Sequence, residues 1–225
     1  MGILFLLTRY SLFARHAFYG TIKGEKTGII GRTGLRIIAG SARGRQIFAP
    51  KGQATRPTLD RVKESLFGIL QFSLPNARVL DLFAGSGNLG LEALSRGASY
   101  AVFNDHSREC CEIIRKNVET LRFSDQATVM QSEALAALER LNGKKPFDIV
   151  FLDPPYRAGA QQALEVLFSK GLIAQGGQAV VEHAWEEPPK SVEGLFSCVD
   201  TRKYGDTGLS FFIAHTGGKE DSDCR

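Results

Sequence analysis

The 225-residue sequence contains only four cysteines and no long hydrophobic run. Cys110, Cys111, Cys198 and Cys224 include no C-x-x-C pair and no histidine at metal-ligand spacing, so they predict free thiols in a reducing compartment, with no metal site and no catalytic thiol. No apolar stretch approaches the roughly 20 residues that cross a bilayer. We therefore expect a cytoplasmic protein, and the composition, 43% hydrophobic and 23% charged, excludes disordered and collagen-like chains.

Positive charge is unevenly distributed along the chain. Residues 1–35 hold five basic residues and one acidic residue, a net +4, and residues 36–63 hold seven basic residues against Asp60, a net +6. The remaining 16 basic and 22 acidic residues give −6 for residues 64–225. This asymmetry predicts a polyanion-binding segment attached to a mildly acidic domain, the alternative being a solvated face without a partner.

The chain divides into four segments. We expect residues 1–34, which show little apolar periodicity and no secretory signal, to be a poorly ordered extension or an upstream start. Residues 35–57 predict a basic β-hairpin with strands at 35–39 and 45–49. A helix at 59–71, capped by Thr58, opens the main domain at 58–216, and residues 217–225 form a polar tail.

The main domain has the pattern of an α/β fold. Apolar strand-like runs at 79–83, 101–104, 128–131, 147–152 and 179–182 alternate with helical periods at 89–95, 108–121, 134–141 and 161–169. Repeated β-α units predict a parallel sheet with helices on both faces. Two strands at 196–202 and 209–214, joined by a Gly-Asp-Thr-Gly turn, predict an antiparallel hairpin that completes the sheet.

A glycine-rich loop follows the first of these strands. Gly85, Gly87 and Gly90 satisfy G-x-G-x-x-G at the start of a helix, where backbone N–H groups can approach a ligand. Asp105, 20 residues after Gly85, is placed to accept hydrogen bonds from ribose hydroxyls. Asp81 would repel the pyrophosphate of a dinucleotide, whereas S-adenosylmethionine (AdoMet) presents an ammonium and a sulfonium, so charge favours AdoMet.

A second motif, Asp153-Pro154-Pro155-Tyr156, ends the strand at 147–152. In open α/β sheets, ligands bind beyond the carboxyl ends of the strands, so this motif and the glycine loop converge. The Asp153 carboxylate and the Pro154 carbonyl can accept both N–H groups of an exocyclic base amine and orient its lone pair, while Tyr156 can stack on the base. The alternative for the tetrapeptide alone is a surface turn.

Together these motifs resemble class I AdoMet-dependent amino-methyltransferases. More narrowly, LRIIAGSARGR at 35–45, TRPTLDRVKESLF at 55–67 and DLFAGSGNLGLEALSRG at 81–97 resemble the bacterial RsmD family, which methylates the N2 amine of a guanine in 16S ribosomal RNA. The similarity runs from residue 35 to about 214. It departs from the family pattern at Glu133, where Asp is usual, and at 104–106, where Asn-Asp-His replaces Val-Glu-Lys.

The resemblance implies a Rossmann-like class I methyltransferase fold, a seven-stranded, mostly parallel sheet with one antiparallel strand. It implies AdoMet as cofactor, 16S rRNA or the small ribosomal subunit as partner, and no metal or membrane; we expect a monomer. The residues implied to bind the cofactor are Asp81, Phe83, Ala84, Gly85, Ser86, Gly87, Asp105 and Glu133. The catalytic residues implied are Asp153, Pro154, Pro155 and Tyr156, and the predicted RNA-binding residues are Arg36, Arg43, Arg45, Arg56 and Arg61.

Three alternatives remain open on sequence grounds. The same tetrapeptide serves adenine-N6 methyltransferases acting on DNA or RNA, although no separate target-recognition segment is visible. A non-catalytic RNA-binding protein of ribosome assembly would keep the pocket without the chemistry. A dinucleotide oxidoreductase would use the glycine loop alone.

Overall fold

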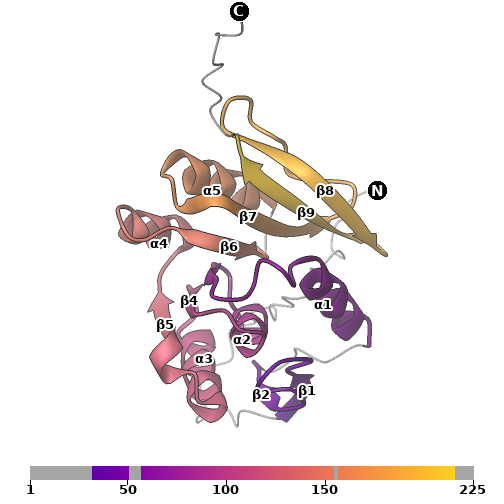
Figure 1. Cartoon of the computed structure of the whole chain (residues 1–225), viewed down its shortest axis with the longest axis vertical. Helices are drawn as coiled ribbons and strands as arrows, with labels where there is room; N and C mark the ends of the chain where they lie inside the picture. Colours follow the sequence, from indigo (N-terminus) through magenta and orange to yellow (C-terminus); the bar gives the residue numbers. More distant parts are fainter. Residues whose placement is uncertain (1–31, 51–56, 155–156, 216–225) are drawn as a thin grey trace, which may run out of the picture.

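The computed structural model describes residues 32–50, 57–154 and 157–215 (Figure 1). The predictions for residues 1–31, the polar tail at 217–225, Arg56, Pro155 and Tyr156 lie outside these residues. Residues 32–34 were expected in the N-terminal extension, but they belong to strand β1 (Arg32–Arg36), which pairs antiparallel with β2 (Gln46–Phe48). The predicted hairpin is therefore confirmed, and its first strand begins three residues before the predicted start.

The main sheet has seven strands among the described residues, in the order β5-β4-β3-β6-β7-β9-β8. Its strands are β3 (Arg78–Asp81), β4 (Tyr100–Asp105), β5 (Ala127–Gln131), β6 (Phe147–Leu152), β7 (Ile173–Ala184), β8 (Phe196–Tyr204) and β9 (Thr207–Ala214). Strands β3 to β7 pair in parallel, and β9 is antiparallel to both β7 and β8. The predicted fold, a mostly parallel sheet with one antiparallel strand, is confirmed.

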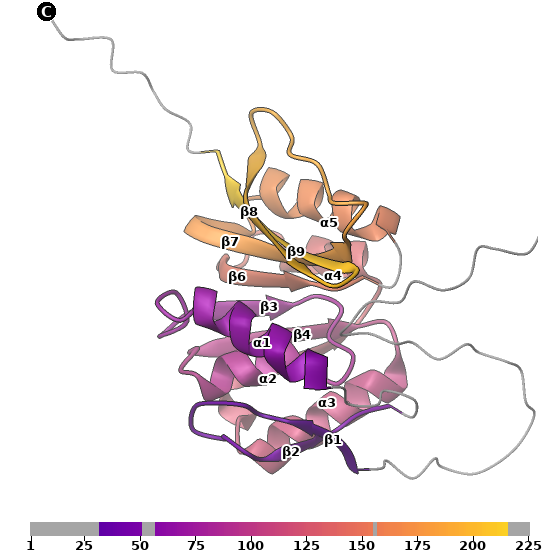
Figure 2. The same ribbon diagram turned by 90° about the vertical axis from the view of Figure 1, so that its right-hand side faces the viewer.

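Five α-helices of the described chain form layers on the two faces of this sheet (Figure 2). Apolar side chains of α1 (Pro57–Ile69), α2 (Asn88–Ser95) and α3 (Arg108–Leu121) share one core cluster with the hairpin. Those of α4 (Ala134–Leu141) and α5 (Arg157–Ser169) share the other core cluster. The central strands β3, β4 and β6 are almost entirely buried, as a parallel sheet covered on both faces requires. No helix of the described residues is long and apolar enough to cross a membrane.

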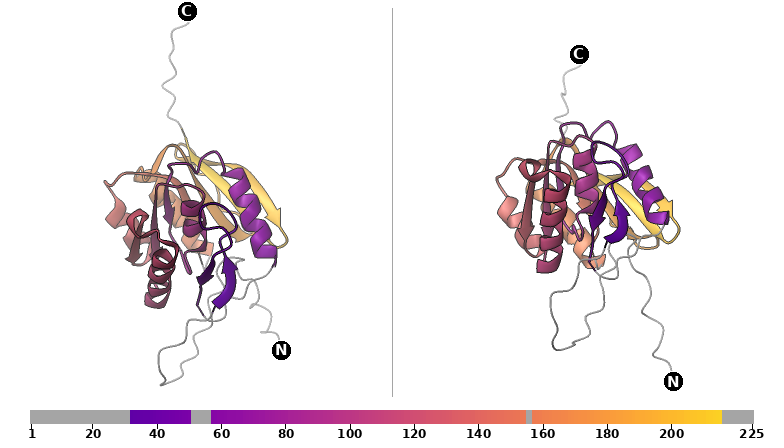
Figure 3. Two further views of the ribbon diagram at one scale, coloured as in Figure 1. Left: turned by 60° about the horizontal axis from the view of Figure 1, so that its bottom comes forward. Right: turned by 90° about the horizontal axis from the view of Figure 1, so that it is seen from below.

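The β1–β2 hairpin packs against the α1–α3 layer and is seen from below in Figure 3, between α3 and α1. Its close approach to α2 requires glycine at residue 40, where φ is +83° and an added Cβ would lie 1.8 Å from the Ser95 carbonyl oxygen. On the other side, the Lys116 ammonium lies 4.0 Å from the centre of the Phe48 ring. The hairpin is therefore seated on the helices that precede and follow β4.

Several element boundaries differ from the prediction. Helix α1 begins at Pro57, so Thr58 lies inside the helix and is not its N-cap; proline suits the first helical position because its φ is already helical. Strand β7 extends from Ile173 to Ala184, whereas only 179–182 was predicted. The cysteines at 110, 111 and 198 are free thiols, as predicted, and burial raises the pKa of Cys110 to about 12, which keeps it unreactive at neutral pH.

Candidate active site

The candidate site lies at the carboxyl ends of β3, β4, β5 and β6. Strand β3 lies between β4 and β6, and the chain leaves β3 toward β4, so the strand order reverses beside β3. This switch point is where open α/β sheets bind ligands. Asp81 and Asp105 end β3 and β4, and Asp153 directly follows β6, so the structure brings the three carboxylates to one edge. Glu133 follows β5 at the same edge and is exposed at the start of α4.

The glycine loop connects β3 to α2 in a conformation that requires its glycines. Gly85 and Gly87 have φ values of +55° and +80°, the left-handed region that other residues rarely adopt. The loop is closed by a hydrogen bond of 2.6 Å from the Gly87 N–H to the Ala84 carbonyl. A Cβ on Gly90 would lie 2.3 Å from Cε1 of Phe103, so the third glycine lets α2 pack directly on β4.

Asp81 is a buried acid behind this loop. Its Oδ2 accepts a hydrogen bond of 3.0 Å from the Gly90 N–H, and the residue is 4% exposed. Burial raises the pKa of Asp81 to about 7, the Gly90 hydrogen bond opposes this rise, and the nearby Asp105 carboxylate adds to it. The carboxyl is therefore poised to ionise near neutral pH, and a cationic ligand beside it would favour the ionised form.

Asp105 fixes the shape of the loop. Its Oδ2 accepts from the Gly85 N–H at 2.8 Å and its Oδ1 from the Ser107 N–H at 2.8 Å. A carboxylate has about four lone-pair sites, so these bonds leave acceptor capacity for ribose hydroxyls. The neighbouring Asn104, for which the sequence predicted no role, donates through Nδ2 to the carbonyls of Leu82 and Ser132, both at 3.1 Å. It thereby joins the chain after β3 to the chain after β5.

Three other residues predicted to bind the cofactor belong to the same loop. Phe83 is half-buried and packs against the α4–α5 core cluster. The Ala84 N–H donates to the Asn104 carbonyl at 2.9 Å. Ser86 is 4% exposed, and its carbonyl accepts from Nδ2 of Asn117 at 2.9 Å. The loop is thus held by the Asn104 backbone at one point and by the Asn117 side chain at another.

Asp153 is the buried acid of the second motif. It is 6% exposed and directly follows Leu152, the residue of β6 paired with Val181 of β7. Pro154 is half-buried. Because β3 is hydrogen-bonded to β6 in parallel register, Asp81 and Asp153 leave neighbouring strands at the same edge. The arrangement places a buried carboxylate at the same sheet edge as the glycine loop.

The predicted RNA-binding arginines fall into two groups. Arg36 forms an ion pair of 2.9 Å with Asp60, and Arg45 donates at 2.8 Å to the Thr120 carbonyl. Arg43 and Arg61 are exposed, and neither side chain has a polar partner among the described residues. Lys63 was counted with the basic segment, but it is 1% exposed and paired with Glu92, so it cannot contact RNA.

The residues fit AdoMet better than a dinucleotide. Two buried carboxylates, Asp81 and Asp105, stand behind a loop whose glycines at 85 and 87 have positive φ values. Negative charge here suits an ammonium and a sulfonium and opposes a pyrophosphate. Among the described parts of the chain, no three His, Cys, Asp or Glu side chains gather in a way that could hold a metal ion.

Comparisons with known proteins agree with this geometry. Residues 35–213 match the family described as "Conserved hypothetical protein 95". The chain is 39% identical over 183 residues to "Putative rRNA methyltransferase YlbH" of Bacillus subtilis, covering 79% of this chain and 98% of that protein. It is 35% identical over 190 residues to "Ribosomal RNA small subunit methyltransferase D" of Escherichia coli, covering 84% and 94%. The solved structure of "Putative methyltransferase yhhF" from Escherichia coli superimposes with a TM-score of 0.72 at 34% identity, covering 80% and 97%.

Proposed function

The chain belongs to the RsmD/YlbH family of AdoMet-dependent rRNA methyltransferases, and from this premise we propose that it methylates the exocyclic N2 amine of a guanine in 16S rRNA. The observation that carries the proposal is the buried Asp153, followed by Pro154, at the same sheet edge as the glycine loop. An acceptor pair at this position suits an amine whose two N–H groups must be held so that its lone pair faces the methyl donor. The similarity to a small-subunit enzyme supports 16S rRNA as the substrate.

The exocyclic amine of guanine is a poor nucleophile because its lone pair is conjugated with the ring. In the proposed reaction, the Asp153 carboxylate and the Pro154 carbonyl accept its two N–H hydrogen bonds and turn the lone pair toward the methyl donor. Bound AdoMet supplies an electrophilic methyl group on its sulfonium. Asp81 and the loop at 83–87 hold the cofactor, with Asp105 at the ribose and Glu133 on the adenine side.

Two residues of the tetrapeptide, Pro155 and Tyr156, complete the proposed base pocket, with Tyr156 stacking on the guanine. The exposed arginines of the hairpin and α1 bind rRNA phosphates. We further propose that the protein works as a monomer in the cytoplasm, where ribosomal subunits are assembled.

The test is methyl transfer from labelled AdoMet to unmodified 30S subunits, naked 16S rRNA and duplex DNA, followed by nucleoside mass spectrometry. We expect label as N2-methylguanosine in rRNA, and Asp153→Ala should lower the rate by about 100-fold or more because the amine loses its orientation. Asp148→Asn is the matched control. Asp148 lies at the other end of β6, where its Oδ2 accepts from the Arg78 N–H at 2.7 Å, so its substitution should leave the transfer rate unchanged.

Each other outcome points to a different function. Label in adenine would replace guanine-N2 by adenine-N6 chemistry. AdoMet binding without transfer to any of the three substrates, and RNA binding indifferent to Asp153→Ala, would favour a ribosome-assembly protein. Stabilisation by NAD in place of AdoMet would indicate an oxidoreductase.

A further inference from the structure

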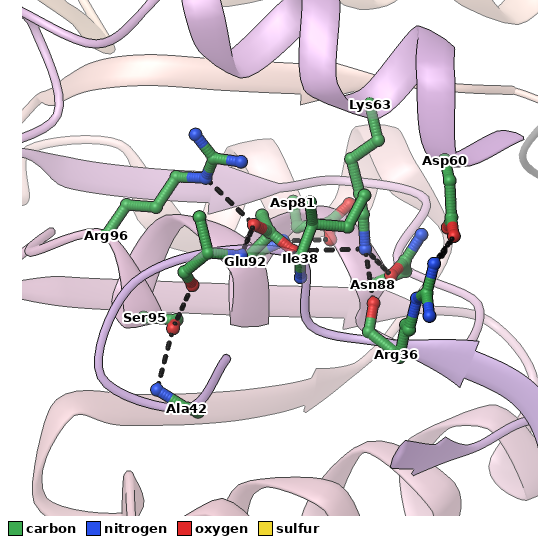
Figure 4. A network of polar contacts seen from close by, with 12 residues as sticks. Arg36, Ile38, Ala42, Asp60, Lys63, Asp81, Asn88, Glu92, Ser95 and Arg96 are labelled. Carbon is green, nitrogen blue, oxygen red and sulfur yellow. Dashed lines mark hydrogen bonds and ion pairs between the residues drawn. The ribbon is translucent and has the colours of Figure 1, made fainter. Parts of the chain in front are cut away.

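The hairpin that carries the proposed RNA-binding arginines is joined to the cofactor loop by buried polar side chains that the proposed chemistry does not use. The first is Lys63 of α1, whose three ammonium hydrogens all have acceptors (Figure 4). Its Nζ donates to the Arg36 carbonyl at 2.7 Å, to Oδ1 of Asn88 at 2.8 Å, and to Oε2 of Glu92 at 3.0 Å. Lys63 thus connects the end of β1 with the residue that directly follows Gly87.

Glu92 gathers the same elements from the side of α2. It is fully buried, and its carboxylate accepts from the backbone N–H groups of Ile38 and Ala39 at 2.8 and 3.0 Å. Arg96 donates to it at 2.8 Å and lies 4.9 Å from the centre of the Phe67 ring of α1. The carboxylate therefore anchors the chain that leaves β1 to the helix that begins at the cofactor loop.

Asn117 of α3 makes a second, separate connection. Its Oδ1 accepts from the Phe48 N–H at 2.7 Å, and its Nδ2 donates to the Phe48 carbonyl at 2.8 Å. The same Nδ2 donates to the Ser86 carbonyl at 2.9 Å. Asn117, which is 1% exposed, thereby holds strand β2 and the cofactor loop at once.

We propose that Lys63, Glu92 and Asn117 are positioning residues, which make the hairpin and the cofactor loop one rigid unit. RNA held by the hairpin is thereby presented in a fixed place relative to the methyl donor, and occupation of the loop by AdoMet restrains the hairpin. A restrained hairpin binds RNA more tightly, so AdoMet strengthens RNA binding. By thermodynamic reciprocity, RNA on the hairpin strengthens AdoMet binding by the same factor. This inference rests on the proposed function for its RNA step, but not for its link between loop and hairpin.

Removing one member of a buried ion pair leaves an uncompensated charge and destabilises a fold, whereas replacing both members is often tolerated. The test variant is therefore the double substitution Lys63→Met with Glu92→Gln, which removes both charges. Glutamine keeps the length of the glutamate side chain, and methionine is one heavy atom shorter than lysine. The matched control is Arg108→Met with Glu112→Gln, an exposed ion pair of 2.8 Å on α3. Asn117→Ala, which cuts the second connection alone, provides an independent variant.

The first measurement needs no RNA. Hydrogen exchange of the Ile38, Ala39 and Phe48 amides, whose acceptors are Glu92 and Asn117, is followed with and without AdoMet. We expect AdoMet to slow this exchange by about tenfold in the unaltered and control chains. The response at Ile38 and Ala39 should disappear in the double variant, and that at Phe48 in Asn117→Ala.

The second measurement is single-turnover methyl transfer to naked 16S rRNA or 30S subunits, whichever the unaltered chain methylates. The double variant should bind AdoMet alone within about threefold of the unaltered chain, yet transfer methyl about 10- to 100-fold more slowly, since small misplacements of reactants have effects of this size. Folded variants with unchanged AdoMet-dependent exchange would overturn the proposal. If the unaltered chain methylates neither substrate, the proposed function fails while the exchange experiment still decides the link.

Discussion

At the scale of single residues, two opposing effects act on the carboxyl group of Asp81: burial favours its neutral form, and a bound cationic ligand would favour its ionised form. Its pKa in the folded protein is about 7, above the ordinary value of 3.8, because burial disfavours the charged form. The native state therefore binds more protons than the unfolded state between these pH values, and the free energy of unfolding falls as pH rises from about 4 to 7. A cationic ligand reverses this preference, since it stabilises the ionised carboxylate.

We accordingly predict that Asp81→Asn stabilises the ligand-free protein and weakens AdoMet binding. At pH 8 its midpoint of thermal unfolding should exceed that of the unaltered chain by about 3–6 °C, whereas at pH 4 the two should coincide. AdoMet affinity of the unaltered chain should rise as pH increases from 6 to 8, and that of the variant should stay constant. Melting curves and AdoMet titrations at these pH values provide the check, with the exposed Asp125→Asn as control.

The role of a residue was predictable from the sequence where it belongs to a short motif. It was not predictable where it depends on partners that lie far away along the chain. The glycine loop and the tetrapeptide could be found from local spacing alone. Apart from Arg96, which lies four positions after Glu92, the partners of Lys63, Glu92 and Asn117 lie 25 to 69 positions away along the chain, so only the folded packing reveals them. One local signal existed: Glu92 is the only charged residue of α2, NLGLEALS, whose other residues are mostly apolar.

At the scale of elements, strand β7 shows why one boundary was missed. Its first half contains Gly176 and Gly177, which resemble a turn in the sequence, and Gly176 has a φ of +77°. In the structure these residues form an irregularity in the pairing with β6, between Phe147 and Ile149. A Cβ on Gly177 would lie 2.9 Å from the Asp148 carbonyl oxygen, so the glycine serves close strand packing.

Strand β8 lies at the edge of the sheet and depends on one aromatic anchor. Phe196 is fully buried, its ring centroid lying 4.7 Å from that of Phe168 and 5.7 Å from that of Phe212. We predict that Phe196→Ala lowers the free energy of unfolding by about 3–5 kcal/mol, because it removes these contacts and leaves a cavity.

Urea denaturation monitored by circular dichroism measures this difference. The control is Val199→Ala on the same strand, where the side chain is 54% exposed and the change should stay within about 0.5 kcal/mol. Equal effects of the two substitutions would show that the aromatic cluster does not hold the edge strand.

At the scale of the whole molecule, charge and chemistry occupy different elements. The basic segment at 36–63 carries a net +6, and residues 64–225 carry −6. The sequence predicted this division, but the structure changes which charges are available. Lys63 is buried, Arg36 faces Asp60, and Arg43 and Arg61 remain exposed without a polar partner among the described residues. Fewer basic side chains are therefore available to bind RNA phosphates than the net charge of residues 36–63 suggests.

This difference makes a quantitative prediction for RNA binding. Each phosphate contact adds about 0.7 to 0.9 to the slope of log affinity against log salt concentration. Replacing Arg43 and Arg61 by alanine should therefore reduce the slope for 16S rRNA by about 1.4–1.8. Asp60→Asn should act in the opposite direction. It frees Arg36 for one more phosphate contact and should therefore steepen the slope by about 0.7 to 0.9. Filter binding at several salt concentrations measures the slope for both variants. The control is Arg108→Ala, because the Arg108 side chain already pairs with Glu112. A slope insensitive to Arg43 and Arg61 would place the RNA elsewhere, whereas opposite shifts in the two variants would identify this face as the one that binds phosphate.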